Sequence, residues 1–122
     1  MNVSKTIPIS RIILFVRDVP GVAAFYQRHF GLVPLDGSED GWLELSAGGC
    51  NLALHRATTT SRERGRSPAK IVFALADIHA AKEHFAANGL KFGKVHEVNG
   101  FAFSNARDPE GNPIQISSRG LQ

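Results

Sequence analysis

Residues 11–19 read RIILFVRDV, and residues 70–78 read KIVFALADI. Each stretch opens on a basic residue, continues through an apolar run and closes on an aspartate followed by a β-branched residue. The segments that follow, GVAAFYQRHFGL at 21–32 and HAAKEHFAANGL at 79–90, also agree in class. Because self-similarity at a constant spacing indicates an internal repeat, we infer that the chain is a duplication.

The repeat continues toward the end of each half. Residues 41–45 (GWLEL) correspond to residues 100–104 (GFAFS) at the same shift of 59 positions, and residues 52–55 (LALH) correspond to residues 114–117 (IQIS) at a shift of 62. A chain of 122 residues has the size of one ordinary domain. We therefore expect one domain that contains both halves.

Each half is predicted to begin with a strand and to continue into a helix. The short β-branched and aromatic runs at 12–16 and 71–75 are typical of strands. Asp18 and Asp77 stand where an N-cap carboxylate accepts hydrogen bonds from the unpaired N–H groups of a first helical turn. A strand followed by a capped helix is thus expected twice.

The rest of each half is predicted to be strands. Gly31 and Gly89 are placed to end the two helices in a left-handed conformation. Short strand candidates follow each helix, near 33–35, 42–45 and 51–55 in the first half and near 92–96, 101–105 and 113–117 in the second.

These elements predict the α+β class, with two βαβββ modules in tandem. We expect a single domain over 1–122 with module one at about 9–56, a linker at 57–69 and module two at about 70–117.

Composition excludes several classes of protein. The net charge of +3 is small and the basic residues are scattered, which argues against nucleic acid as a partner. Cys50 is the only cysteine, so a reducing compartment is favoured. No secretory leader and no apolar run of about 20 residues is visible. We expect a cytoplasmic protein that does not enter a membrane.

The segments ISRIILFVRDVPGVAAFYQRHFGLVPL at 9–35 and DPEGNPIQI at 108–116, with the duplication, resemble the vicinal oxygen chelate superfamily. That superfamily contains glyoxalase I, extradiol dioxygenases, fosfomycin resistance enzymes and bleomycin resistance proteins. The resemblance implies a curved mixed sheet around a funnel, with the helices outside, and a homodimer.

The resemblance also locates the family's metal ligands, and this chain departs from them. The first-strand histidine of each half falls on Arg11 or Lys70, and the last-strand glutamate falls on Gln115. The remaining position falls on Ala53, or on His55 if the register differs by two residues. Arginine and lysine side chains are cationic and repel a divalent ion. We therefore expect no metal and no other cofactor.

Strand alternation predicts which side chains face the funnel. The expected ligand-binding residues are Arg11, Phe15, Trp42, Glu44, His55, Lys70 and Gln115, with Phe101 or Phe103 as a further wall. Such a surface, apolar with a few convergent polar groups, is typical of a small-molecule site. We expect a planar or aromatic ligand with an anionic group, which Arg11 would bind while Trp42 makes the flat contact.

Other interpretations remain open. In one, Arg11 and Lys70 pair with Glu44 and Glu97 at a strand edge and have only a structural role. The leading function is a metal-free small-molecule-binding protein resembling bleomycin resistance proteins. The alternatives are a lyase, isomerase or dioxygenase of the same superfamily, with His55 or Glu44 as general base or with a non-standard metal-ligand set, and an assembly module that acts through a dimer surface. No catalytic residue is assigned.

Overall fold

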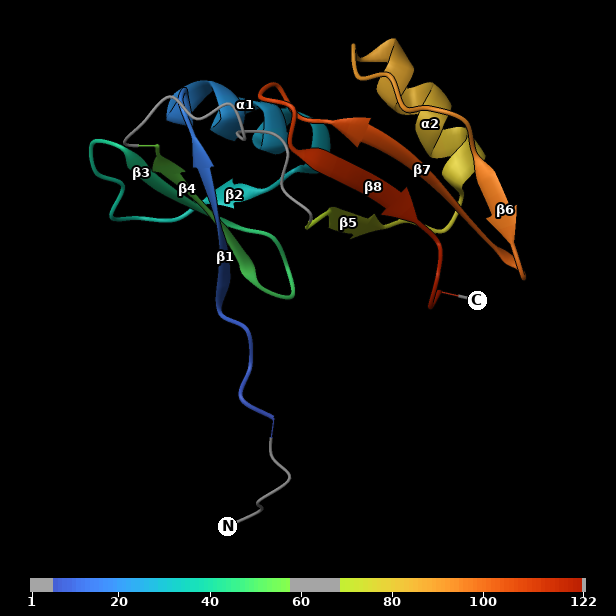
Figure 1. Cartoon of the computed structure of the whole chain (residues 1–122), viewed down its shortest axis with the longest axis horizontal. Coiled ribbons are helices and arrows are strands. Elements are labelled where there is room, and N and C mark those ends of the chain that lie inside the picture. Colours follow the sequence, from blue (N-terminus) through green and yellow to red (C-terminus); the bar gives the residue numbers. More distant parts are fainter. Residues whose placement is uncertain (1–5, 58–68, 122) are drawn as a thin grey trace. The chain divides into compact units, whose positions relative to one another are not determined.

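The computed structural model describes residues 6–57 and 69–121, which belong to two compact units, 1–58 and 59–122. The predicted linker, 57–69, lies outside the described residues except for its two end residues. Each unit is a four-stranded mixed sheet with one helix (Figure 1).

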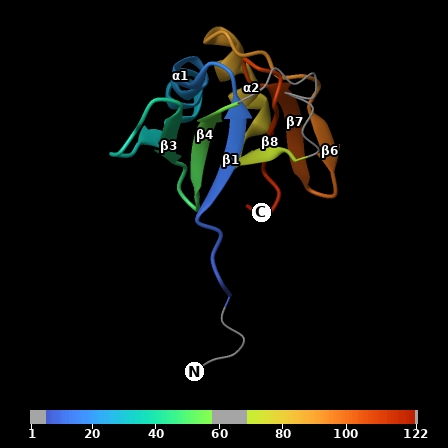
Figure 2. The same ribbon diagram turned by 60° about the vertical axis from the view of Figure 1, so that its left-hand side comes forward.

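The first unit contains one helix packed on β3 and β4 (Figure 2). Its elements are β1 (Arg11–Val16), α1 (Val19–Phe30), β2 (Val33–Pro34), β3 (Trp42–Ser46) and β4 (Asn51–Arg56). The strands lie in the order β1-β4-β3-β2, with β1 parallel to β4 and the other pairs antiparallel.

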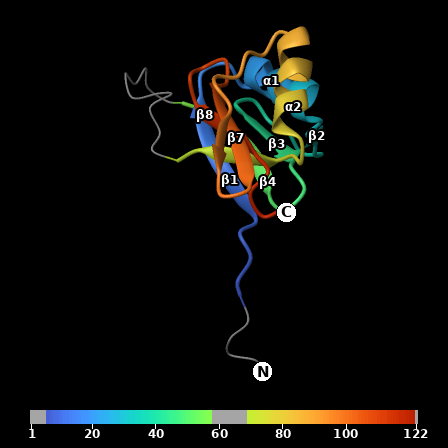
Figure 3. The same cartoon turned by 90° about the vertical axis from the view of Figure 1, so that its right-hand side faces the viewer.

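The second unit repeats this topology, with its helix packed on β7 (Figure 3). Its elements are β5 (Ile71–Ala74), α2 (Ile78–Ala87), β6 (His96–Val98), β7 (Phe101–Arg107) and β8 (Pro113–Ser117). The order is β5-β8-β7-β6, and only the β5–β8 pair is parallel. The predicted α+β class with two tandem βαβββ modules is confirmed.

Both helices begin at the predicted aspartates. Asp18 Oδ1 accepts a 3.0 Å hydrogen bond from the backbone N–H of Gly21, and Asp77 Oδ1 accepts one of 3.0 Å from that of Ala80. Helix α1 ends at Gly31, whose φ of 69° is left-handed. The hydrogen bonds to Asp18 and Asp77 each pair a first-turn N–H group that the helix itself leaves without an acceptor.

The core of each unit lies between its helix and one face of its sheet. As alternation predicts, one set of strand side chains is buried on this face. The buried strand residues on this face include Val16, Leu45, Leu52 and Leu54 in the first unit and Ser104, Ile114 and Ile116 in the second. Val22 and Tyr26 of α1, and Ile78 and Phe85 of α2, are buried as well. The opposite face of each sheet carries the residues expected to bind a ligand.

Two details of the second half differ from prediction. Strand β6 was expected near 92–96, but it spans His96–Val98 because Asn99 and Gly100 form a two-residue turn with φ of 46° and 88° that pairs Val98 with Phe101. Positive φ at both residues is the type I′ geometry, whose twist matches a hairpin. Phe92 is instead a buried residue outside any strand.

The correspondence between β3 and β7 is also corrected. Trp42 lies opposite His55, whereas Phe103, not Phe101, lies opposite Ser117. Trp42 therefore corresponds to Phe103, two residues beyond the match found in the sequence. Gly41 and Gly100 both have positive φ, but the strands after them enter their sheets at different registers. A shift of two residues keeps every side chain on its predicted face.

Candidate functional site

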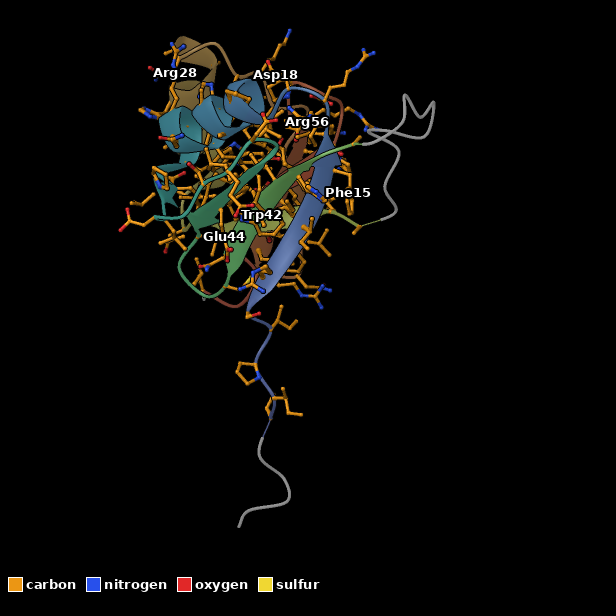
Figure 4. All side chains as sticks on the ribbon, turned by 90° about the vertical axis from the view of Figure 1, so that its left-hand side faces the viewer. Phe15, Asp18, Arg28, Trp42, Glu44 and Arg56 are labelled. Atoms are coloured by element: carbon orange, nitrogen blue, oxygen red, sulfur yellow. The ribbon has the colours of Figure 1, made fainter. Side chains whose placement is uncertain are left out.

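A row of three rings crosses the open face of the first sheet. The strand register places Phe15 on β1 opposite His55 on β4, and His55 opposite Trp42 on β3. The ring centroids of Phe15 and His55 are 5.3 Å apart, and those of Trp42 and His55 are 5.7 Å apart with the rings edge to face. Figure 4 labels Phe15 on β1 and Trp42 on β3, the strands that flank β4. We call these three residues the aromatic row.

The aromatic row combines apolar area with unused polar atoms. Phe15 is 57% exposed, and Trp42 and His55 are half-buried. Within the described residues, neither the indole N–H of Trp42 nor a ring nitrogen of His55 makes a hydrogen bond. Buried or half-buried indole and imidazole groups usually find such a partner. These nitrogens are therefore available to a bound molecule.

Beside the aromatic row, a polar cluster surrounds the carboxylate of Glu44. Arg11 Nε donates a 2.9 Å hydrogen bond to Glu44 Oε2, and Asn51 Nδ2 donates one of 2.8 Å to the same oxygen. Both hydrogen bonds lower the pKa of Glu44, and the bond from Asn51 has the larger effect. The pairing of Arg11 with Glu44 agrees with the interpretation that gave Arg11 a structural role.

The second sheet carries a similar cluster around Asn105. Lys70 Nζ donates a 3.1 Å hydrogen bond to Asn105 Oδ1, and Gln115 Nε2 donates one of 3.0 Å to the same oxygen. The expected pairing of Lys70 with Glu97 is wrong, because Glu97 Oε1 instead lies 3.2 Å from His79 Nε2. Glu97 alternates with the open-face residues of β6, so it points away from Lys70.

An aromatic ladder lies on the open face of β6 and β7. The rings of His96 and Phe103 are stacked with centroids 4.9 Å apart, and Phe101 is stacked on Phe103 at 6.2 Å. The Arg119 guanidinium lies over the Phe101 ring, 5.1 Å from its centroid. Phe101 and Phe103 are both half-buried, and both lie on the open face, where one of them was expected to form a wall of the site.

The two polar clusters occupy equivalent positions. In the first sheet Ala53 lies opposite Glu44, and in the second Gln115 lies opposite Asn105. Ile12 lies opposite Leu52 and its repeat equivalent Ile71 lies opposite Ile114, so Gln115 corresponds to Ala53 and not to His55. By the same register Glu44 corresponds to Asn105, and Arg11 corresponds to Lys70.

The structure brings the predicted site residues together in small groups. On the first sheet they form the aromatic row and the Arg11–Glu44 pair, and on the second Lys70 and Gln115 meet through Asn105. Sequence reasoning missed Asn51 and Asn105. Each lies on a predicted strand, at a position where alternation directs the side chain to the open face. This alternation is the signal by which the sequence could have identified them.

The four positions that the resemblance assigns to a metal do not fit one. They hold a guanidinium, a methyl group, an ammonium and an amide, at Arg11, Ala53, Lys70 and Gln115. The two cations already donate hydrogen bonds to Glu44 and Asn105, and neither can bind a divalent ion while protonated. In the part of the chain that the structure describes, no three histidine, cysteine, aspartate or glutamate side chains are grouped to hold a metal.

Comparison with known proteins gives one family. The model of the Glyoxalase/Bleomycin resistance protein/Dioxygenase superfamily matches residues 8–116. No curated protein matches the chain significantly.

Solved structures with the same fold include a lactoylglutathione lyase from Agrobacterium tumefaciens, with 23% identity, 93% of this chain and 94% of that chain covered, and a TM-score of 0.74. A virulence protein from Salmonella typhimurium is 20% identical, with 93% and 97% covered and a TM-score of 0.72. An integron cassette protein from the mobile metagenome of V. cholerae is 21% identical, with 93% and 95% covered and a TM-score of 0.69. At these identities the likeness shows the fold alone.

None of the described helices is long and apolar enough to cross a bilayer.

Proposed function

The chain belongs to the Glyoxalase/Bleomycin resistance protein/Dioxygenase superfamily, and on that premise we propose that it is a metal-free protein that binds a small aromatic or anionic molecule on the open faces of its sheets. The superfamily supports several chemistries on one fold, so the proposal depends on the side chains of this chain and not on the fold.

The observation that carries the proposal is the aromatic row. Three adjoining rings, inclined to one another by 49° and 68°, offer an apolar surface, and a planar molecule can pack against the exposed face or edge of one of them. The free nitrogens of Trp42 and His55 add hydrogen-bonding groups at the middle and the end of that surface. A mostly apolar surface with a few polar groups that fix orientation is typical of small-molecule sites.

The anionic part of the proposal requires at least one of two cationic side chains, Arg11 or Lys70. Both side chains lie on open faces, and that of Arg11 is 44% exposed. Each donates one hydrogen bond to a neighbouring side chain, of 2.9 Å from Arg11 and 3.1 Å from Lys70, and retains other N–H donors. Such donors bind carboxylates through charge-assisted hydrogen bonds.

Trp42 allows a direct test, because it is the only tryptophan in the chain. A titration with a panel of aromatic carboxylic acids should change its fluorescence and raise the melting temperature, since a ligand that binds only the native state stabilises it. His55→Ala should weaken binding about tenfold, and His84→Ala, which changes an exposed histidine on α2, should not. No response of wild-type protein to any compound would contradict the proposal.

A second variant tests the anionic part. Arg11→Ala combined with Lys70→Ala should weaken the binding of aromatic acids but not of their neutral amides. If both proteins bound the acids equally, an anionic ligand would be ruled out. Metal analysis of purified protein tests the metal-free state, and stoichiometric zinc, nickel, iron or manganese would contradict it.

The enzyme alternatives lack a supporting observation. The lowered pKa of Glu44 makes its carboxylate a weaker base at neutral pH. Among the described residues His55 makes ring contacts with Phe15 and Trp42 but no hydrogen bond or ion pair, whereas a general base is usually oriented by a third polar group.

We further propose that the protein is a homodimer and that it is cytoplasmic. Light scattering tests the dimer, because a monomeric mass would contradict it.

A further inference from the structure

The two polar clusters differ in one chemical group. In both sheets a cation on the first strand donates a hydrogen bond to an oxygen on the third strand, from Arg11 to Glu44 and from Lys70 to Asn105. The acceptor is a carboxylate in the first sheet and an amide in the second. The clusters are therefore alike in position but unlike in charge.

This difference leaves the positive charge of Lys70 uncompensated. The charge of Arg11 is balanced by the carboxylate of Glu44, whose Oε2 lies 2.9 Å from Arg11 Nε. An amide carries no charge, so Lys70 and Asn105 together keep one positive charge. Among the described residues Lys70 contacts no carboxylate, and its side chain is exposed.

The hydrogen bonds of Asn105 also determine which way its amide is turned. Its Oδ1 accepts from Lys70 Nζ and from Gln115 Nε2, so Nδ2 is the atom left over. Within the described residues Nδ2 has no hydrogen-bond partner. An ammonium group with two unused N–H donors thus lies beside an amide with two more, on the open face of one sheet.

We propose that Lys70 and Asn105 form an oxyanion site on the second sheet, which binds the carboxylate of a small organic acid. Arg11 is a structural cation in this assignment, and not the group that binds the anion. The assignment rests on the proposed function, because the organic acid is the ligand proposed there. One ammonium and one amide suit a singly charged carboxylate, whereas phosphate is more often bound by the planar forks of arginines.

Benzoate and benzamide are matched probes, since they differ mainly in charge. The side-chain amide signals of Asn105 and Gln115 in a ¹H–¹⁵N spectrum should shift on titration with benzoate, and much less with benzamide. Asn105→Asp places a carboxylate beside Lys70, as Glu44 stands beside Arg11. It should weaken benzoate binding about tenfold and leave benzamide binding unchanged.

Glu44→Gln is the reciprocal control, because it removes the charge that balances Arg11. It should not weaken benzoate binding. Lys70→Met, which keeps most of the aliphatic stem, should reproduce the loss seen in Asn105→Asp even if that variant folds poorly. Wild-type affinity for benzoate in a folded Lys70→Met variant, or no movement of the Asn105 amide, would overturn the assignment.

Failure of this site can be told from failure of the proposed function. If Trp42 fluorescence responds to benzoate and benzamide alike while the Asn105 amide does not move, the proposed function stands and the oxyanion site is wrong. If the Asn105 amide responds to benzoate in a Lys70-dependent way while Trp42 does not respond, the oxyanion site stands and stacking on the aromatic row is wrong.

Discussion

The indole of Trp42 and the imidazole of His55 lie edge to face across adjacent strands, with ring centroids 5.7 Å apart. Directly opposed residues of an antiparallel pair are close enough for their side chains to shield each other from water. His55 therefore covers part of an indole that would otherwise be more exposed on the open face.

Removing the imidazole should make Trp42 more accessible to solvent. His55→Ala should shift the tryptophan emission to longer wavelength and increase its quenching by acrylamide. His84→Ala should change neither, because His84 is an exposed residue of α2 whose ring contact is with Phe85. Identical emission and quenching in wild type and His55→Ala would contradict the contact.

The stability of the protein should depend on pH through Glu44. Its pKa is lower in the folded state than its ordinary value, so the unfolded chain binds more protons between the two values. The resulting stabilisation is complete above the ordinary glutamate pKa of about 4.3 and is lost as the pH falls through the folded value. Wild type should therefore lose stability in this acidic range.

Glu44→Gln should lack this part of the acid dependence. At neutral pH it should melt a few degrees lower than wild type, because Arg11 loses its ionic partner, and the two melting curves should converge toward low pH. Glu83→Gln, a change of an exposed glutamate on α2, is the control and should follow wild type. A constant difference between Glu44→Gln and wild type at every pH would contradict the lowered pKa.

The N-cap of α2 should contribute measurably to stability. Asp77 Oδ1 accepts a hydrogen bond from the backbone N–H of Ala80, so Asp77→Ala leaves that donor without its partner. The expected loss in the free energy of unfolding is about 1 kcal/mol, measured by urea denaturation. Asp77→Asn keeps a capping oxygen and should lose much less. Equal stability of the alanine and asparagine variants would show that the cap contributes little.

The fold could be predicted because its decisive pattern is local and occurs twice. Alternation along 52–55 was enough to place Leu52 and Leu54 toward the helix and His55 on the open face, since successive strand residues point to opposite sides. Asp18 and Asp77 mark helix starts by a mechanism that involves only residues three positions away. None of these inferences requires knowledge of distant contacts.

The clusters could be predicted only in part, because they depend on the register between strands. Glu44 was expected on the open face, but its bond from Asn51 arises from the way β3 and β4 pair. The sequence does not point to Asn105, because the similarity of residues 41–45 to residues 100–104 matches Glu44 with Phe103, two residues short of the observed correspondence. An isolated amide on a strand carries no pattern by which its hydrogen bonds can be inferred.

The Asn99–Gly100 turn that displaces β6 should be sensitive to a side chain at its second position. Gly100 has a φ of 88°, and a Cβ there would meet no atom within 4 Å, so an alanine would fit in space but strain the backbone. Gly100→Ala should lower the free energy of unfolding by about 1–2 kcal/mol. Gly49→Ala is a matched control, because Gly49 also has open space around it but does not have a positive φ, and it should be neutral or slightly stabilising. Equal stability of the two variants in urea denaturation would mean that the turn does not require the left-handed conformation, and that the position of β6 is set by something other than this hairpin.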